Sequence, residues 1–402
     1  MNTAHTAQLS DRINALSESQ TIAMAKKAKD LASQGFNVIN LSLGEPDFGT
    51  PQFIKDAAKV ALDEGYTHYS PISGYADLRA AIAKKLSEEN NLPWKDENVV
   101  VSTGAKQSIA NVVLCLVNPG DEVVVLSPYW VSYLELVKLA EGVPIMVGGT
   151  IDNDFKPTAA EIEKAITPKT KLLMFSSPCN PTGSVFNKAE FDAIVELLER
   201  HPNIFVIADE IYEYINYEGK HLSIGSYPSI AERVITVNGF SKGFAMTGWR
   251  LGYIGAAKWL ADACDKMQGQ FTSGTNSIAQ RAALAAIEGS RADCEMMLAA
   301  FRKRRDLVLS MVKDIPGIKA NIPAGAFYLF PDVTAFYGKS YNGTTVNNSS
   351  DMSMYLLAEA LVSTVPGDAF GDNDCIRFSF AASEADLADA MERIKKALAK
   401  LQ

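Results

Sequence analysis

Lys242 stands in the stretch GFSKGFAMTGWRLGY, residues 239–253, directly after an apolar run. A lysine at the end of a buried strand loses hydration, which lowers its pKa and makes its amine a nucleophile able to form a Schiff base. Ser241 and Arg250, in the same stretch, could offer a hydroxyl and a planar guanidinium to a phosphate. A solvated surface lysine is the simpler alternative, and the neighbouring glycines do not exclude it.

Four more polar clusters each follow a short segment rich in valine and isoleucine. They are TGAKQS after 98–102, PYW after 121–127, SPCNPTG after 171–176 and DEIY after 203–208. Such segments are typical of strands that are buried on both faces of a sheet. Ligands of open α/β sheets bind outside the carboxyl ends of the strands, so these clusters predict one shared crevice.

Three of these clusters have a chemical and a simpler structural interpretation. Gly104 and Ala105 could begin a helix whose free N–H groups bind a phosphate, although an ordinary tight turn would also explain them. Trp130 could stack on a ring, although an aromatic residue after a strand is more often part of the core. Asn180 could donate to a ligand oxygen, although asparagine is common in turns.

Asp209 is a sharper candidate because it follows the apolar run IFVIA. A carboxylate buried there is costly unless it meets a cation, and the alternative is a helix N-cap. With Tyr212 close by, the five clusters match pyridoxal 5′-phosphate, which has a phosphate, a ring, a phenolic oxygen, a basic ring nitrogen and an aldehyde. We therefore predict that Lys242 carries this cofactor and that Ser241 and Arg250 bind its phosphate.

Length and charge restrict the classes of protein to which the chain can belong. At 402 residues it is too long for one simple core, so two packed regions are expected. A net charge of −9 argues against nucleic acid or a membrane as partner, because either would need a dense basic surface. The five cysteines and four histidines lack ligand spacing, which argues against a metal. No signal-like N-terminus or long apolar stretch is present, so we expect a soluble cytoplasmic protein.

The apolar pattern also predicts the organisation of the chain. Helical spacing covers 19–35, 53–65, 75–90, 105–117, 130–141, 188–200, 290–314 and 384–401. Strands are expected at 98–102, 121–127, 171–176, 203–209 and 233–239, and a polar surface loop at 338–351. We expect a large α/β domain over 46–290 and a smaller α+β domain over 291–402. An N-terminal arm and helix, 1–45, would belong to the smaller domain.

The motifs LSLGEPDFGTP (41–51), SPCNPTG, DEIYE, SKGFAMTGWRLGY, VPGDAFG and CIRFSFA together resemble the class I/II aminotransferases of fold type I. The resemblance runs nearly end to end and is strongest to bacterial-type aspartate aminotransferases related to prephenate aminotransferases. It implies a large domain with a mixed, mostly parallel sheet flanked by helices, pyridoxal phosphate as cofactor, and a homodimer with shared active sites. It also implies a ping-pong exchange of the amino group between L-aspartate, or another acidic amino acid, and 2-oxoglutarate.

The resemblance also implies a role for each cofactor residue. Lys242 is implied as the Schiff-base lysine and general acid–base, and Asp209 as the partner of the ring nitrogen. The phenolic oxygen would be bound by Tyr212 and Asn180, and the ring would stack on Trp130. The matching phosphate and pocket positions are Gly104, Ala105, Lys106, Ser241 and Arg250, and Tyr69 would reach the phosphate of a partner subunit.

For the substrate, the resemblance implies that Arg377 and the backbone of Gly44 bind the α-carboxylate. Trp130 and Asn180 are implied as further substrate-binding residues. The alternation of CIRFSF places Arg377 on the polar face of a strand, where an arginine is usually just exposed. Lys106 and Thr21 match the positions that recognise the distal carboxylate. Relatives that accept prephenate usually carry a basic residue four positions before that threonine. Here Ser17 occupies it, so we expect prephenate to be a poor acceptor.

Other functions remain as alternatives. A prephenate or aromatic aminotransferase, or a lyase such as a carbon–sulfur lyase, would keep the fold and the cofactor. A non-catalytic regulator would need a DNA-binding domain, for which the short N-terminal arm leaves no room, and the intact Lys242 argues against it. A nucleotide-dependent oxidoreductase is disfavoured because no GxGxxG motif follows a predicted strand.

Overall fold

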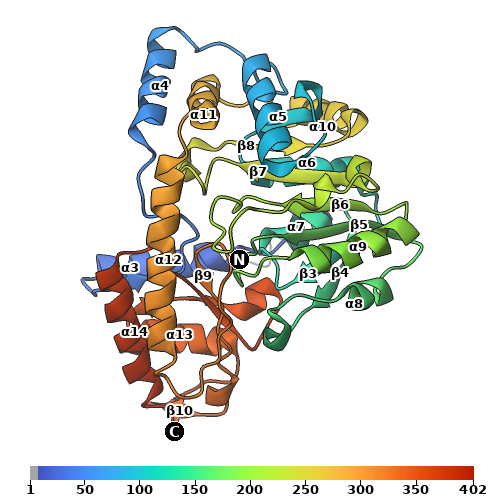
Figure 1. Cartoon of the computed structure of the whole chain (residues 1–402). Coiled ribbons are helices and arrows are strands. Elements are labelled where there is room, and N and C mark those ends of the chain that lie inside the picture. The colour runs from blue at the N-terminus through green and yellow to red at the C-terminus, as the bar shows by residue number, and fades with distance from the viewer. Residues whose placement is uncertain (1–7) are drawn as a thin grey trace.

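The computed structural model describes residues 8–402, so residues 1–7 of the predicted N-terminal arm lie outside the described part. Figure 1 shows a sheet enclosed by helices in one part of the molecule and a smaller group of helices beside it. The long helix α12 (Ala292–Val312) runs from the first part to the second. This arrangement confirms the predicted α/β architecture with a smaller α+β region.

The central sheet has seven strands in the order β2-β8-β7-β6-β5-β3-β4. Their bounds are β2 (Val99–Ser102), β3 (Glu122–Ser127), β4 (Val143–Gly148), β5 (Thr170–Ser176), β6 (Phe205–Asp209), β7 (Val234–Gly239) and β8 (Gly252–Gly255). β8 is antiparallel to both of its neighbours, whereas the remaining pairs are parallel. The sheet is therefore mixed and mostly parallel, and the five strands with polar clusters all end at the same edge.

Helices cover both faces of the sheet because the side chains of each strand alternate between them. Val123 and Val125 of β3 pack with helices of one face, and Val124 and Leu126 pack with those of the other. The first face carries α6 (Ala105–Leu116), α7 (Ser132–Leu139) and α10 (Lys258–Phe271), and the second α8 (Ala159–Lys164) and α9 (Lys188–Arg200). A third cluster joins β2 and β8 to α4 (Gln52–Asp63), α5 (Ala76–Asn90) and α11 (Ser277–Glu288).

The smaller region combines segments from both ends of the chain. Its helices are α3 (Gln20–Ser33), α13 (Ser349–Glu359) and α14 (Glu384–Leu398). An antiparallel sheet has the order β13 (Val365–Pro366), β14 (Ile376–Ser379) and β9 (Tyr328–Leu329). β1 (Ile39–Asn40) pairs in parallel with β12 (Val362–Ser363), which joins the N-terminal segment to the C-terminal one. The domain limits given above stay a prediction.

Two segments differ from the expectations drawn from the sequence. The N-terminal arm contains a short helix, α2 (Asp11–Asn14). The polar segment 338–351 contains the hairpin of β10 (Ser340–Tyr341) and β11 (Thr344–Thr345), and Asn348 then caps α13 by accepting from the backbone of Asp351. Within residues 8–402, no helix has the length and apolar character needed to cross a bilayer. In the same range no three His, Cys, Asp or Glu side chains gather as metal ligands would.

Candidate active site

A cavity of about 330 Å³ lies at the carboxyl edge of the central sheet. Residues that follow β2, β3, β5, β6 and β7 line it together, as the strand-end clusters predict. Its opposite wall comes from the N-terminal segment and from β9 and β14 of the smaller region. From the predicted set it brings together Thr21, Gly44, Ala105, Lys106, Trp130, Asn180, Asp209, Tyr212, Ser241, Lys242, Arg250 and Arg377.

Lys242 follows β7 and borders this cavity. Its Nζ donates to the backbone carbonyl of Gly44, on the opposite wall. Loss of hydration lowers the pKa of Lys242 to about 8, with the charges of Arg377 and Arg250 acting in the same direction. The predicted lowering is confirmed, and the amine is therefore easier to deprotonate than that of a surface lysine.

Asp209 is the last residue of β6 and is 4% exposed. Its Oδ2 accepts from the hydroxyl of Tyr133 at 2.7 Å and its Oδ1 from the backbone N–H of Ile211 at 3.2 Å. Burial raises the pKa of Asp209 to about 6, because neither neutral partner compensates fully for the lost hydration. Residues 211–214 form turns and no helix follows Asp209 directly, so the N-cap alternative is wrong.

Two candidate functional residues were not predicted from the sequence. Tyr133 lies in α7 and is fully buried, and burial raises its pKa well above the usual value, so it stays a donor to Asp209. The hydroxyl of Tyr328, in β9, lies 2.6 Å from the hydroxyl of Tyr212 and borders the cavity. The sequence around each tyrosine did not indicate a functional role, because each occurs in an apolar segment. The one available indication was that Tyr133 follows Trp130 by less than one helical turn.

Arg377 is 1% exposed, so the expectation that an arginine on this strand face is usually solvated does not apply. Its Nη1 donates to Asn180 Oδ1 at 2.9 Å and its Nη2 to the carbonyl of Ser42 at 2.6 Å, while its Nε is buried without a partner. Gly44 lies beside it, and a Cβ there would come 2.7 Å from the Tyr328 hydroxyl. The guanidinium has a free N–H donor, and the glycine beside it leaves space for a ligand. This arrangement suits the binding of a small carboxylate.

The other end of the cavity is built around the start of α6. Gly104 has a φ of +84° and no side chain caps the helix that begins at Ala105. A Cβ on Gly104 would collide with the guanidinium of Arg250, so only glycine lets this arginine lie against the helix start. Ser241 and Arg250 border the cavity here. Backbone N–H groups at a helix start, a hydroxyl and a guanidinium form a typical phosphate site.

Lys106 and Thr21 lie at the mouth of the cavity. The Lys106 ammonium is 5.0 Å from the centre of the Trp130 ring, and lost hydration together with Arg250 lowers its pKa. Tyr69 is 98% exposed and does not border the cavity, so its role across a dimer stays a prediction. Ser17 lies outside this cavity, and its backbone N–H donates to Glu135 at 2.7 Å.

The charged groups around the cavity are mostly cationic. They are Lys106, Lys242, Arg250 and Arg377, against the carboxylates of Glu45 and Asp209. A cavity of this kind favours ligands that carry more than one anionic group. The start of α6 and the guanidinium of Arg377 in β14 would then bind different anionic groups of such a ligand.

Residues 37–394 match the family model described as aminotransferase class I and II. The chain belongs to this family. The aminotransferase is 47% identical over 399 residues to a Petunia hybrida protein named bifunctional aspartate aminotransferase and glutamate/aspartate-prephenate aminotransferase, covering 98% of this chain and 83% of that one. It is 40% identical over 395 residues to the aspartate/prephenate aminotransferase of Nitrosomonas europaea, covering 97% and 100%.

Solved structures give the same result. The aspartate aminotransferase of Rhizobium meliloti superposes with a TM-score of 0.95 at 37% identity, covering 98% of this chain and 99% of that one. The aspartate aminotransferase of Thermus thermophilus, solved with maleate, gives a TM-score of 0.92 at 40% identity and covers 97% and 99%. These similarities confirm the fold and the family that the sequence motifs indicated.

Proposed function

We propose that this aminotransferase uses pyridoxal phosphate, held by Lys242, to move an amino group between L-aspartate, or another acidic amino acid, and 2-oxoglutarate. The observation that carries the proposal is the pairing of two unusual groups at one cavity. Asp209 is a buried carboxylate with only neutral hydrogen-bond partners, and Lys242 is a partly buried amine with a pKa of about 8. A cofactor with a basic ring nitrogen and an aldehyde would use both.

The remaining residues fit this cofactor. The pKa of Asp209 is raised because its present neighbours do not compensate for its burial. A protonated ring nitrogen would provide a cation that does so. The start of α6, with Ser241 and Arg250, would hold the phosphate, and the absent Cβ of Gly104 makes room for that guanidinium. Trp130 would lie on the ring. Tyr212 and Asn180 would bind the phenolic oxygen, while further cofactor contacts would come from Ala105, Lys106 and Tyr69.

When bound, pyridoxal phosphate supplies an electron sink for the charge that develops at the substrate Cα. Asp209 keeps a proton on the ring nitrogen, which strengthens that sink. Lys242, whose pKa lies near neutrality, accepts the proton from the substrate Cα and can return it. Arg377 orients the substrate by binding its α-carboxylate with two donors, which fixes the Cα–H bond within reach of Lys242.

Two kinds of observation support acidic substrates. Lys106 and Thr21 border the same cavity as Arg377, so a dicarboxylate would find a second cation besides that arginine. Two relatives carry aspartate in their names, and the Thermus thermophilus structure was solved with maleate, which is a dicarboxylate. Prephenate occurs in the names of the same relatives and is the second candidate acceptor.

We also propose a cytoplasmic homodimer that acts on small molecules, with no nucleic-acid or membrane partner. Tyr69 supports the dimer, because a tyrosine that is 98% exposed is available to a second subunit. All five cysteines are free, which suits a reducing compartment. Residues 1–45 with 291–402 would form the smaller of two domains, since β1 pairs with β12.

Transfer of labelled nitrogen tests the proposed reaction. The protein, loaded with pyridoxal phosphate, is given [¹⁵N]aspartate with 2-oxoglutarate, prephenate or no acceptor. We expect [¹⁵N]glutamate with 2-oxoglutarate and little labelled product with prephenate. Release of labelled ammonia without an acceptor would show a lyase instead, and preferential labelling of the prephenate product would reverse the order of acceptors.

A further inference from the structure

The turn after β6 separates two cavities. Asp209 and Tyr212 face the candidate active site. Glu213 and Tyr214 border a second cavity of about 360 Å³, together with Asn90 at the end of α5 and Arg291 before α12. Contacts on the side of the second cavity can therefore influence the position of the two residues that face the active site.

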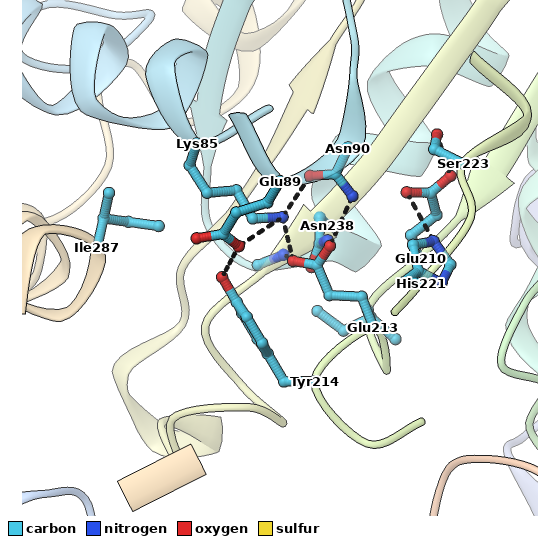
Figure 2. Close-up of polar contacts among 12 residues, drawn as sticks. Lys85, Glu89, Asn90, Glu210, Glu213, Tyr214, His221, Ser223, Asn238 and Ile287 are labelled. Carbon is cyan, nitrogen blue, oxygen red and sulfur yellow. Dashed lines mark hydrogen bonds and ion pairs between the residues drawn. The ribbon is translucent and has the colours of Figure 1, made fainter. Parts of the chain in front are cut away.

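Glu213, the residue after Tyr212, is held by a buried ion pair (Figure 2). Lys85 donates to its Oε1, and the side chains of Lys85 and Glu213 are 2% and 5% exposed. Asn90 Nδ2 donates to Glu213 Oε2 at 2.8 Å, and its Oδ1 accepts from Lys85 Nζ at 2.8 Å. Lys85, Asn90 and Glu213 thus form a closed triad in which each side chain contacts the other two.

Glu210, the residue after Asp209, is held in a similar way. It is 2% exposed, and its Oε1 accepts from the Ser223 hydroxyl at 2.6 Å. His221 Nε2 lies 3.0 Å from its Oε2. The backbone N–H of Glu213 donates to the carbonyl of Glu210 at 2.9 Å, so the two glutamates belong to one hydrogen-bonded turn. Each cofactor-facing residue is therefore followed by a buried glutamate that does not border the candidate active site.

Stability alone is a weak reason for such a pair. Removing two charges from water is costly, and a well-packed apolar pair is often as stable or more stable. Burial alone would raise the pKa of Glu213, but Lys85 and then His221 outweigh it and hold that pKa below its usual value. Glu213 is thus a carboxylate with directional partners, which fix its orientation more narrowly than apolar contacts do.

We propose that Glu213, together with Lys85 and Asn90, is a positioning residue that sets the place of Asp209 and Tyr212 in the active site. The triad acts through the backbone of the turn and touches neither substrate nor cofactor. This inference rests on the proposed function, since it assumes that Asp209 and Tyr212 bind pyridoxal phosphate. A misplacement of about 1 Å at such residues can cost about 100-fold in rate, even when the mutation is remote.

The double variant Lys85→Met/Glu213→Leu tests the proposal. It removes both charges together, so neither is left buried and unpaired. The buried amide of Asn90 loses both of its partners, so the apoprotein is expected to be less stable than wild type but still folded. Pyridoxal phosphate is then titrated into the apoproteins and its binding followed by absorbance. We expect the dissociation constant to rise about 10- to 100-fold, as it does for metals when the partners that orient their ligands are lost. The kcat at saturating cofactor should fall as well.

Lys156→Met is the matched control, because it breaks a partly buried ion pair with Glu190 in which no residue of the turn takes part. It should leave cofactor affinity unchanged. A folded double variant with native cofactor affinity would overturn the proposal. If the double variant does not fold, Glu213→Gln, which keeps the shape of the side chain, must still weaken cofactor binding, and native affinity there would overturn the proposal as well. Failure of the wild-type protein to bind pyridoxal phosphate would instead overturn the proposed function and this inference with it.

Discussion

Replacing Lys106 by methionine should separate acidic from apolar amino-group donors. The Lys106→Met variant loses the ammonium but keeps an unbranched side chain near Trp130. We expect kcat/KM for aspartate to fall, because its distal carboxylate would lose the cation that Lys106 supplies in addition to Arg377. For alanine, which has no distal carboxylate, a change of about 0.5 kcal/mol or less is expected, as for most surface substitutions.

The exposure of Lys106 determines the size of this loss. Lys106 is an exposed residue that nevertheless borders the cavity, so its pair with a substrate carboxylate is neither fully solvated nor fully buried. An exposed ion pair contributes about 0.2–1 kcal/mol, whereas breaking a buried one costs about 2–5 kcal/mol. We expect about 1.5–3 kcal/mol, the range of hydrogen bonds to charged groups. This corresponds to a decrease of about 10- to 150-fold in kcat/KM.

Single-turnover half-reactions measure this difference without interference from the acceptor, which is itself a dicarboxylate. The cofactor-loaded protein is mixed with aspartate or alanine alone, and the change in cofactor absorbance gives each rate. Lys106→Arg is the control, because it keeps the charge and should retain most of the preference for aspartate. An equal decrease for both donors would refute the reasoning, since Lys106 would then act only through the cofactor or the fold and not on the distal carboxylate.

Three further predictions follow from the same geometry. Burial raises the pKa of Asp209 from 3.8 to about 6, so the folded apoprotein binds more protons than the unfolded chain between these values and loses stability as pH rises through them. Asp209→Asn should therefore stabilise the apoprotein by about 2–3 kcal/mol at pH 7 in denaturant titrations, with little difference near pH 4; equal stability at pH 7 would contradict this. Gly104→Ala should weaken binding of pyridoxal phosphate at least about tenfold, because its Cβ would displace Arg250. Gly120→Ala, with the same φ of +84° and open space around it, should leave that affinity unchanged; equal effects of the two changes would exclude the steric explanation. Mixing a Tyr69→Ala variant with a Lys242→Ala variant should restore part of the activity through mixed dimers, and sedimentation should show a dimer. A monomer without rescue would refute the shared site.

The sequence indicated a shared cavity well where a polar residue lies at or just after the end of a buried strand. Asp209 could be found because it ends the otherwise apolar strand β6, and Lys242 because it follows the buried strand β7 by three residues. β4 and β8 were not predicted. β4 contains Pro144 and is partly exposed at the edge of the sheet, and β8 has only four residues with a glycine at each end.

Contacts between distant parts of the chain could not be predicted in the same way. Tyr133 meets Asp209 across 76 positions, and Lys85 meets Glu213 across 128. In α5, Lys85 looks like any solvated helical lysine until the turn after β6 covers it. For Arg377, the alternation of the sequence predicted the strand face on which it lies. Only the fold shows that this face borders a cavity and not solvent.

The central claim, that Lys242 carries pyridoxal phosphate and gives it up to an acidic amino acid, has a direct chemical test. The loaded protein is treated with borohydride, which makes the bond between cofactor and lysine permanent, and the labelled peptide is identified by mass spectrometry. We expect the label on Lys242, no label in Lys242→Ala, and loss of the label when aspartate is added before borohydride. A label on another lysine, or one that aspartate does not remove, would contradict the account.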